Sequence, residues 1–147
     1  MSTNERTVKA TPEQVWEVLA DGWLYPLWVV GATRMRDVDE GWPAVGTKLH
    51  HSVGVWPGLL DDTTEVLEVD PGRKIVLQAR AWPGGEATVS LELTPAEGGA
   101  RVTMWEDATK GPGTLVPSLL RSPMIKWRNV EALRRLALVV EGRTQQH

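Results

Sequence analysis

One amphipathic stretch, residues 116–140, constrains the fold most, because it is the only long helical pattern in the sequence. Its apolar residues recur at steps of three and four, the spacing that places side chains along one face of an α-helix. The predicted apolar stripe comprises Leu120, Met124, Trp127, Val130, Leu133, Ala137 and Val140. The opposite arc carries Lys126, Arg128, Asn129, Glu131, Arg134 and Arg135. Such a stripe needs an apolar surface elsewhere in the chain to lie on.

Prolines and glycines around this stretch leave its start open. Pro117 suits the first turn of a helix, whereas Pro123 in a helix interior predicts either a kink or a late start at Ser122. Gly142 is the expected end of the helix. The preceding glycine-containing loop and the first half of the helix, between residues 108 and 127, are where we expect any entrance to a cavity.

The middle of the chain supplies the apolar surface as strands. Short segments of alternating apolar and polar residues, separated by glycine and proline turns, predict strands at 31–39, 47–55, 59–69, 74–82, 86–94 and 100–107. Their short connections favour an antiparallel meander. A strand at 5–9 precedes it, followed by a helix that begins at Thr11-Pro12-Glu13-Gln14 with a capping box, and by a second short helix at 23–28.

Alternation along the strands assigns an inward and an outward face. The inward set includes Leu77 and Ala79 in one strand and Val89 and Leu91 in the next. Other strands add Leu49, His51, Val53, Met104 and Glu106 to this set. In 59–69 the pattern is ambiguous: Asp61, Thr63 and Glu65 point inward in one alternative, and a bulge after Pro57-Gly58 reverses the faces in the other.

Composition excludes several classes of protein. The 147 residues fit a single domain, 1–147, and a net charge of −3 argues against a general nucleic-acid binder. The chain has no cysteine, so thiolate chemistry and disulfides are excluded. No apolar run reaches membrane-spanning length and the polar start is unlike a signal peptide, so we expect no membrane insertion and a cytoplasmic location. Adjacent His50 and His51 point to opposite faces of a strand, so no metal site is predicted.

The order of these elements resembles a known superfamily. The stretch 10–21, Ala-Thr-Pro-Glu-Gln-Val-Trp-Glu-Val-Leu-Ala-Asp, and the stretches 42–47, 64–77 and 99–104 are similar to START/Bet v 1-like (SRPBCC, polyketide cyclase/dehydrase-like) proteins of bacteria. The resemblance implies an α+β helix-grip fold: a curved antiparallel sheet of about seven strands around a long C-terminal helix, with two short helices between strands 1 and 2. It also implies a cavity between sheet and helix.

Within that architecture we expect a small hydrophobic or aromatic ligand, lipid- or polyketide-like, and no cofactor. His51 and Glu106 are candidate catalytic residues, because an inward histidine titrates near neutral pH and a carboxyl group in apolar surroundings can donate a proton. The alternative for Glu106 is solvent exposure or a pair with Arg36 or Arg101. The predicted ligand-binding residues are Trp28, Met35, His51, Val53, Trp56, Leu77, Ala79, Val89, Leu91, Met104, Glu106, Leu120, Met124 and Trp127.

Three functions remain open from the sequence. The first is ligand binding without catalysis. The second is a polyketide cyclase or dehydratase type of enzyme that uses the inward acid–base residues. The third is a non-catalytic interaction protein, either a homodimer through outward Trp82 and Trp105 or a protein that binds a partner through the basic face of the long helix.

Overall fold

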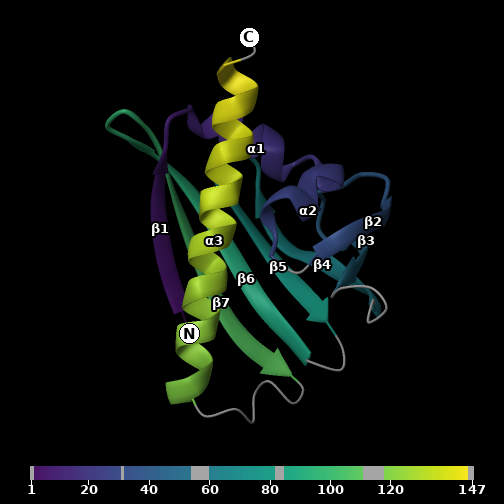
Figure 1. Ribbon diagram of the computed structural model, residues 1–147. Helices are drawn as coiled ribbons and strands as arrows, with labels where there is room; N and C mark the ends of the chain where they lie inside the picture. The colour runs from purple at the N-terminus through teal and green to yellow at the C-terminus, as the bar shows by residue number, and fades with distance from the viewer. Residues whose placement is uncertain (1, 31, 54–59, 82–84, 111–117, 146–147) are drawn as a thin grey trace.

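The computed structural model describes residues 2–30, 32–53, 60–81, 85–110 and 118–145, and in some stretches, such as 118–125, the backbone alone. The described part forms one antiparallel sheet in the order β1-β7-β6-β5-β4-β3-β2, crossed on one face by a long helix (Figure 1). The strands are β1 (Ser2–Val8), β2 (Ala32–Val38), β3 (Lys48–Val53), β4 (Leu60–Asp70), β5 (Lys74–Ala81), β6 (Gly85–Ala96) and β7 (Gly99–Lys110). The helices are α1 (Pro12–Leu19), η1 (Gly22–Leu24), α2 (Tyr25–Trp28) and α3 (Ser118–Gln145). The predicted helix-grip fold is confirmed.

The start of α1 follows from the capping box. The Thr11 hydroxyl accepts a hydrogen bond from the Gln14 backbone N–H at 3.1 Å, and the Gln14 side chain accepts one from the Thr11 N–H at 2.9 Å. These two bonds satisfy backbone donors that the first turn of a helix leaves unpaired. The helix then buries Val15, Val18 and Leu19 in the core.

The ambiguity in β4 is resolved by a bulge inside the strand. Thr64 and Val66 are fully buried, the register shifts between Val66 and Glu68, and Leu67 is 44% exposed. The extra residue at the bulge restores an inward orientation at Val69, which packs against the core. The alternative with Asp61, Thr63 and Glu65 pointing inward is therefore wrong.

Helix α3 is longer than the sequence pattern indicated. It already runs from Ser118, so the predicted late start at Ser122 is wrong, and it passes through Gly142 to Gln145. A glycine in a helix interior costs only about 1 kcal/mol relative to alanine, which neighbouring contacts can offset. One such contact is at Glu141, whose side chain accepts a hydrogen bond from the Lys9 backbone N–H at 3.2 Å.

The buried face of α3 is also rotated from the predicted stripe. Leu133, Ala137 and Val140 are buried as expected, but Trp127 is 66% exposed and Val130 is 47% exposed. Because each residue turns a helix by about 100°, Trp127 points roughly 160° away from Asn129, which is buried. The face that meets the rest of the protein consists of Asn129, Ala132, Leu133, Leu136, Ala137 and Val140.

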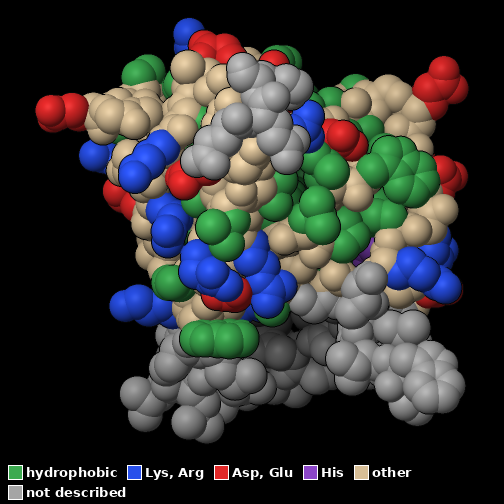
Figure 2. Space-filling view, turned by 45° about the horizontal axis from the view of Figure 1, so that its top comes forward, with side chains coloured by type: hydrophobic (Ala, Val, Ile, Leu, Met, Phe, Trp, Pro, Cys, Tyr) green, Lys and Arg blue, Asp and Glu red, His purple; other side chains and the backbone are tan. Residues whose placement is uncertain are grey.

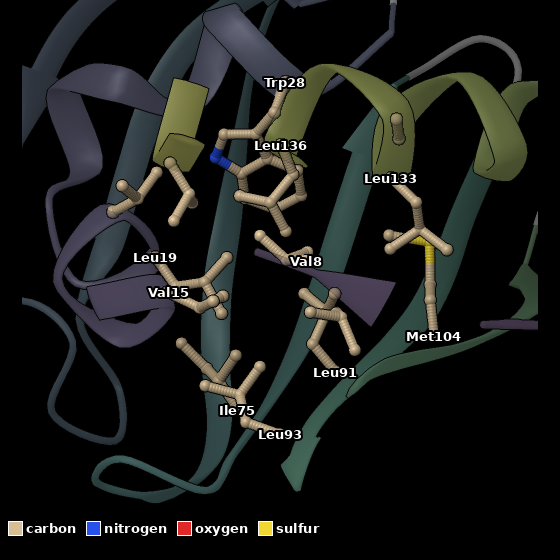
Figure 3. Close-up of a cluster of buried hydrophobic side chains, with 14 of the residues drawn as sticks. Val8, Val15, Leu19, Trp28, Ile75, Leu91, Leu93, Met104, Leu133 and Leu136 are labelled. Carbon is tan, nitrogen blue, oxygen red and sulfur yellow. The ribbon is translucent and has the colours of Figure 1, made fainter. Parts of the chain in front are cut away.

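The core lies where α1, α2 and α3 meet the concave face of the sheet (Figure 3). Leu136 of α3 lies beside Trp28 of α2, and Leu133 lies beside Met104 of β7. Leu91 in β6, next to the central strand β5, is fully buried beneath them. The C-terminal half of α3 thus packs as ordinary core, and the fold leaves its preceding turns, around Arg128 and Asn129, to cover a cavity.

Gly99 permits the close approach of β1 to β7, which gives a test of this packing. A Cβ at Gly99 would overlap the Val8 carbonyl oxygen, a backbone atom that cannot move aside alone. We expect Gly99→Ala to lower the free energy of unfolding by about 2 kcal/mol or more. Gly142→Ala is the matched control: its Cβ would meet nothing within 4 Å, and it should raise stability by about 0.5–1 kcal/mol. Equal changes in the free energy of unfolding for the two variants, measured in urea, would contradict the close packing of β1 against β7.

Candidate functional site

A cavity of about 210 Å³ lies between the concave face of the sheet and helices α2 and α3. Strands β2 to β7 contribute to its floor, and the two helices cover it. Its wall is mainly apolar, with polar groups at a few positions. The lining residues are Tyr25, Trp28, Val29, Val30, Ala32, His51, Thr64, Leu77, Ala79, Arg80, Val89, Met104, Glu106, Arg128, Asn129 and Ala132.

Many of the residues expected from the sequence meet at this cavity. The structure brings together Trp28, His51, Leu77, Ala79, Val89, Met104 and Glu106. Leu91 lies in the core and Met35 packs half-buried against it, so neither is part of the lining. Trp127 is exposed. Trp56, and the side chains of Val53, Leu120 and Met124, lie outside the described residues.

Sequence reasoning missed Tyr25, Thr64, Arg128 and Asn129, all of which line the cavity. Thr64 was missed because the bulge in β4 reverses the inward positions of that strand. Arg128 and Asn129 were placed on the solvent side because they are polar. The spacing of Asn129 from Ala132, Leu133 and Leu136, at three, four and seven residues, is the signal that could have found it.

Tyr25, Thr64 and His51 form one hydrogen-bonded group in the cavity wall. The Thr64 Oγ1 lies 3.1 Å from the Tyr25 hydroxyl and 2.8 Å from His51 Nε2. The Tyr25 ring also stacks on His51, with centroids 5.5 Å apart, and meets Trp28 edge-on. Because each ring is held by packing as well as by a hydrogen bond, the group presents fixed polar atoms.

Burial sets the charge of this group. It raises the pKa of Tyr25 to about 12, so the phenol stays protonated. Burial also lowers the pKa of His51 below its ordinary value of 6.5, and the nearby Asp62 carboxylate offsets only part of this effect. At neutral pH, His51 is therefore an uncharged imidazole that can accept a proton.

Glu106 pairs with a residue that the sequence did not indicate. Its carboxylate accepts a hydrogen bond from the Arg128 guanidinium, with only 7% of the Glu106 side chain exposed. The pairs considered with Arg36 and Arg101 are wrong, because Arg36 donates to the carbonyl groups of His51 and Asp62, and Arg101 lies 3.7 Å from Glu5. The ion pair links β7 to α3 at the cavity, and the surroundings of Glu106 are not wholly apolar.

Three buried polar atoms of the cavity residues have no hydrogen-bond partner in the described part of the protein. They are Nε1 of Trp28, Nδ1 of His51 and Nδ2 of Asn129, and each of these residues is at most 4% exposed. Such atoms are uncommon, because buried polar groups are nearly always paired. All three residues line the cavity, so its wall includes side chains whose polar groups are not fully paired by the described residues.

The outer surfaces considered for partner binding are less distinctive. Trp105 is half-buried, and Trp82 lies outside the described residues. On the basic face of α3, Arg134 and Arg135 both donate to Glu131, and Arg128 is paired with Glu106. Lys and Arg side chains gather on the face shown in Figure 2, beside a separate group of hydrophobic side chains.

Metal-ligand clusters and membrane-spanning helices are both absent from the described residues. No group of three or more histidine, cysteine, aspartate or glutamate residues there could hold a metal ion. None of the helices in these ranges is long and apolar enough to cross a membrane.

Comparisons with known proteins agree with this architecture. The family described as "Polyketide cyclase / dehydrase and lipid transport" matches residues 2–141. No curated protein was found to match the sequence.

Solved structures with the same fold share little sequence with this chain. A Rhodobacter sphaeroides protein has 24% identity and a TM-score of 0.72, covering 95% of this chain and 91% of its own. The di-domain ARO/CYC StfQ of the steffimycin biosynthetic pathway has 16% identity and a TM-score of 0.72, covering 97% of this chain and 51% of its own. Ara h 8.0201 has 15% identity and a TM-score of 0.71, covering 95% of this chain and 96% of its own. At these identities the likeness shows the fold.

The depressed pKa of His51 predicts a specific dependence of stability on pH. Unfolded His51 binds a proton below about pH 6.5, whereas folded His51 resists protonation until a lower pH. The unfolded state therefore holds more protons in that window, and stability falls as the pH drops through it. His51→Gln should show a smaller loss of unfolding free energy between pH 7.5 and pH 5.5 than the unmodified protein. Identical losses in urea titrations would rule out this assignment.

Proposed function

We propose that this chain, which belongs to the polyketide cyclase / dehydrase and lipid transport family, binds a small hydrophobic or aromatic ligand in the cavity under α3. The observation that carries the proposal is a mainly apolar cavity whose lining residues Trp28, His51 and Asn129 each keep one buried polar atom without a partner among the described atoms. A ligand pocket typically combines such apolar walls with a few placed polar groups.

Cavity size limits the ligand. The volume of about 210 Å³ is below the roughly 300–1,000 Å³ of common ligand pockets. An engineered cavity of roughly 150 Å³ in another protein holds one benzene ring. The present cavity therefore suits a compound of one or two rings better than a long acyl chain.

The unpaired atoms limit the ligand's chemistry. Trp28 Nε1 and Asn129 Nδ2 can only donate hydrogen bonds, so they favour an acceptor oxygen on the ligand. His51 Nδ1 can donate or accept, depending on its tautomer. Because Glu106 and Arg128 neutralise each other at the cavity, a neutral ligand with a carbonyl or hydroxyl oxygen suits the site better than an ion.

A matched pair of probes tests this proposal. In calorimetric titrations we expect 1-indanone, whose carbonyl oxygen can accept hydrogen bonds, to bind at least about five-fold more tightly than indane, which has none. Ala132→Met, which fills the cavity, should abolish binding of both, whereas Ala44→Met, at an exposed position, should change neither. Asn129→Leu should reduce the preference for the ketone.

Two outcomes would count against ligand binding in this cavity. One is 1-indanone affinity that is unchanged by Ala132→Met, which would place the ligand elsewhere. The other is equal affinity for indanone and indane, which would remove the role of the unpaired donors while leaving an apolar site.

A second candidate function is acid–base catalysis in the same cavity. It is favoured by the shared position of His51 and Glu106 in the lining, and by the uncharged state of His51 at neutral pH. His51 would remove a proton from a carbon beside a carbonyl group, as an aldol cyclisation requires. The pairing of Glu106 with Arg128 leaves proton abstraction to His51.

A small diketone distinguishes catalysis from binding alone. If the protein is an enzyme of this type, it should convert 2,6-heptanedione to 3-methylcyclohex-2-enone and water. The increase in the absorbance of the enone product measures the rate. His51→Gln should lower the rate at least about 100-fold, the usual contribution of a positioned general base. His50→Gln is the matched control, because His50 faces Asp39 outside the cavity, and it should leave the rate unchanged. A rate that is insensitive to His51→Gln would exclude this mechanism.

A further inference from the structure

A second hollow, of about 560 Å³, lies beside α1 and η1, against the segment that joins β2 to β3. It shares no lining residue with the cavity under α3. Two kinds of side chain characterise its wall, indoles and carboxylates: Trp16, Trp23, Trp42, Glu17, Asp21 and Asp39. We call this hollow the tryptophan groove.

The three indoles come from three different segments of the chain. Trp16 is in α1, Trp23 in η1 and Trp42 in the β2–β3 connection. Trp16 and Trp42 pack half-buried against the core, whereas Trp23 is 56% exposed. Indole is the aromatic ring that attracts cations most strongly, so a groove with three of them can hold a cation against ring faces.

The charge of the groove is negative, which suits a bound cation. Its lining contains three acidic residues and no lysine, arginine or histidine. Asp39 remains ionised, because the hydrogen bond from the His50 ring keeps the pKa of this carboxyl below its ordinary value. Glu17 is exposed on the last part of α1. A cation in the groove would therefore meet both indole rings and negative charge.

Two carboxylates of the groove already accept hydrogen bonds, which leaves fewer acceptor positions for a cation that donates. Asp21 accepts a bond from the Trp23 backbone N–H, and Asp39 accepts from the Lys48 N–H as well as from His50. A primary ammonium group brings three donors that need acceptors. A quaternary ammonium group has no donors, and needs only ring surface and nearby negative charge.

One polar atom in the wall lacks a partner. Nε1 of Trp42 is buried and makes no hydrogen bond to any described atom. Unpaired buried donors are exceptions that call for an explanation, such as a missing ligand.

From the three indoles, the acidic lining and the carboxylates that already accept hydrogen bonds, we propose that the tryptophan groove binds a small quaternary ammonium compound of the choline type. The compound would lie with its methyl groups against the indole rings and its charge near Glu17 and Asp39. This site is independent of the ligand proposed under α3.

Choline and an uncharged isostere test the proposal. The compound 3,3-dimethylbutan-1-ol has the shape and hydroxyl group of choline, but a carbon atom replaces the nitrogen. In calorimetric titrations at low salt, choline should bind at least about three-fold more tightly than this alcohol, the lower range for a cation–π contribution. In amide NMR spectra, choline should shift the indole N–H signals of Trp16, Trp23 and Trp42.

Substitutions at exposed positions supply matched comparisons. Trp23→Ala should weaken choline binding at least about three-fold, whereas Trp127→Ala, which removes an exposed tryptophan of α3, should leave it unchanged. Glu17→Gln should weaken binding, and Glu13→Gln, one turn earlier in α1, should do so less. Circular dichroism of each variant reports folding, and Glu17→Gln carries the test should Trp23→Ala unfold.

Three results would overturn the proposal. They are equal affinity for choline and the neutral alcohol, choline binding that survives both Trp23→Ala and Glu17→Gln, and indole shifts confined to tryptophans outside the groove. Preferential binding of a lysine-rich peptide over choline would also overturn it, because the argument requires a cation without hydrogen-bond donors.

Discussion

The packing of α3 against the sheet and α1 is the constraint on which the rest of this structure depends. Leu133, Leu136, Ala137 and Val140 are almost completely buried, and they cover apolar residues of the sheet that would otherwise face water. An antiparallel sheet with one wet face needs such a cover on the other. Because the tight packing occupies the C-terminal half of the helix, the preceding turns are held above the sheet at a distance that leaves a cavity.

A charge pair holds those preceding turns in place. Arg128 of α3 and Glu106 of β7 meet across the edge of the cavity, with Glu106 largely shielded from water. A pair of this kind contributes little net stability, because desolvation opposes its attraction, but loss of one partner leaves the other charge unpaired. The pair joins α3 to β7 beside the buried Asn129, while Trp127 on the opposite side of the helix is 66% exposed.

Local signals in the sequence predicted the elements and most of the inward positions. The capping box at Thr11 and the alternation in β5, β6 and β7 are decided by neighbouring residues, so they can be recognised without the fold. The bulge at Leu67 and the rotation of α3 depend on contacts between distant segments. Thr64 was missed because of the bulge, whereas Arg128 and Asn129 were assigned to the solvent side because they are polar, although all three line the cavity.

Two of the chain's eight tryptophans, Trp28 and Trp42, line the two proposed sites, and the chain has no phenylalanine. Phenylalanine would fill a core position with a similar apolar ring, but it has no N–H donor. Trp28 in the cavity and Trp42 in the tryptophan groove both bury an N–H without a partner in the described structure, which is unfavourable in a site meant only for packing. In a binding site the same N–H becomes an asset, since a ligand oxygen can satisfy it. The two proposed sites therefore share one feature, a tryptophan whose buried N–H has no partner among the described residues.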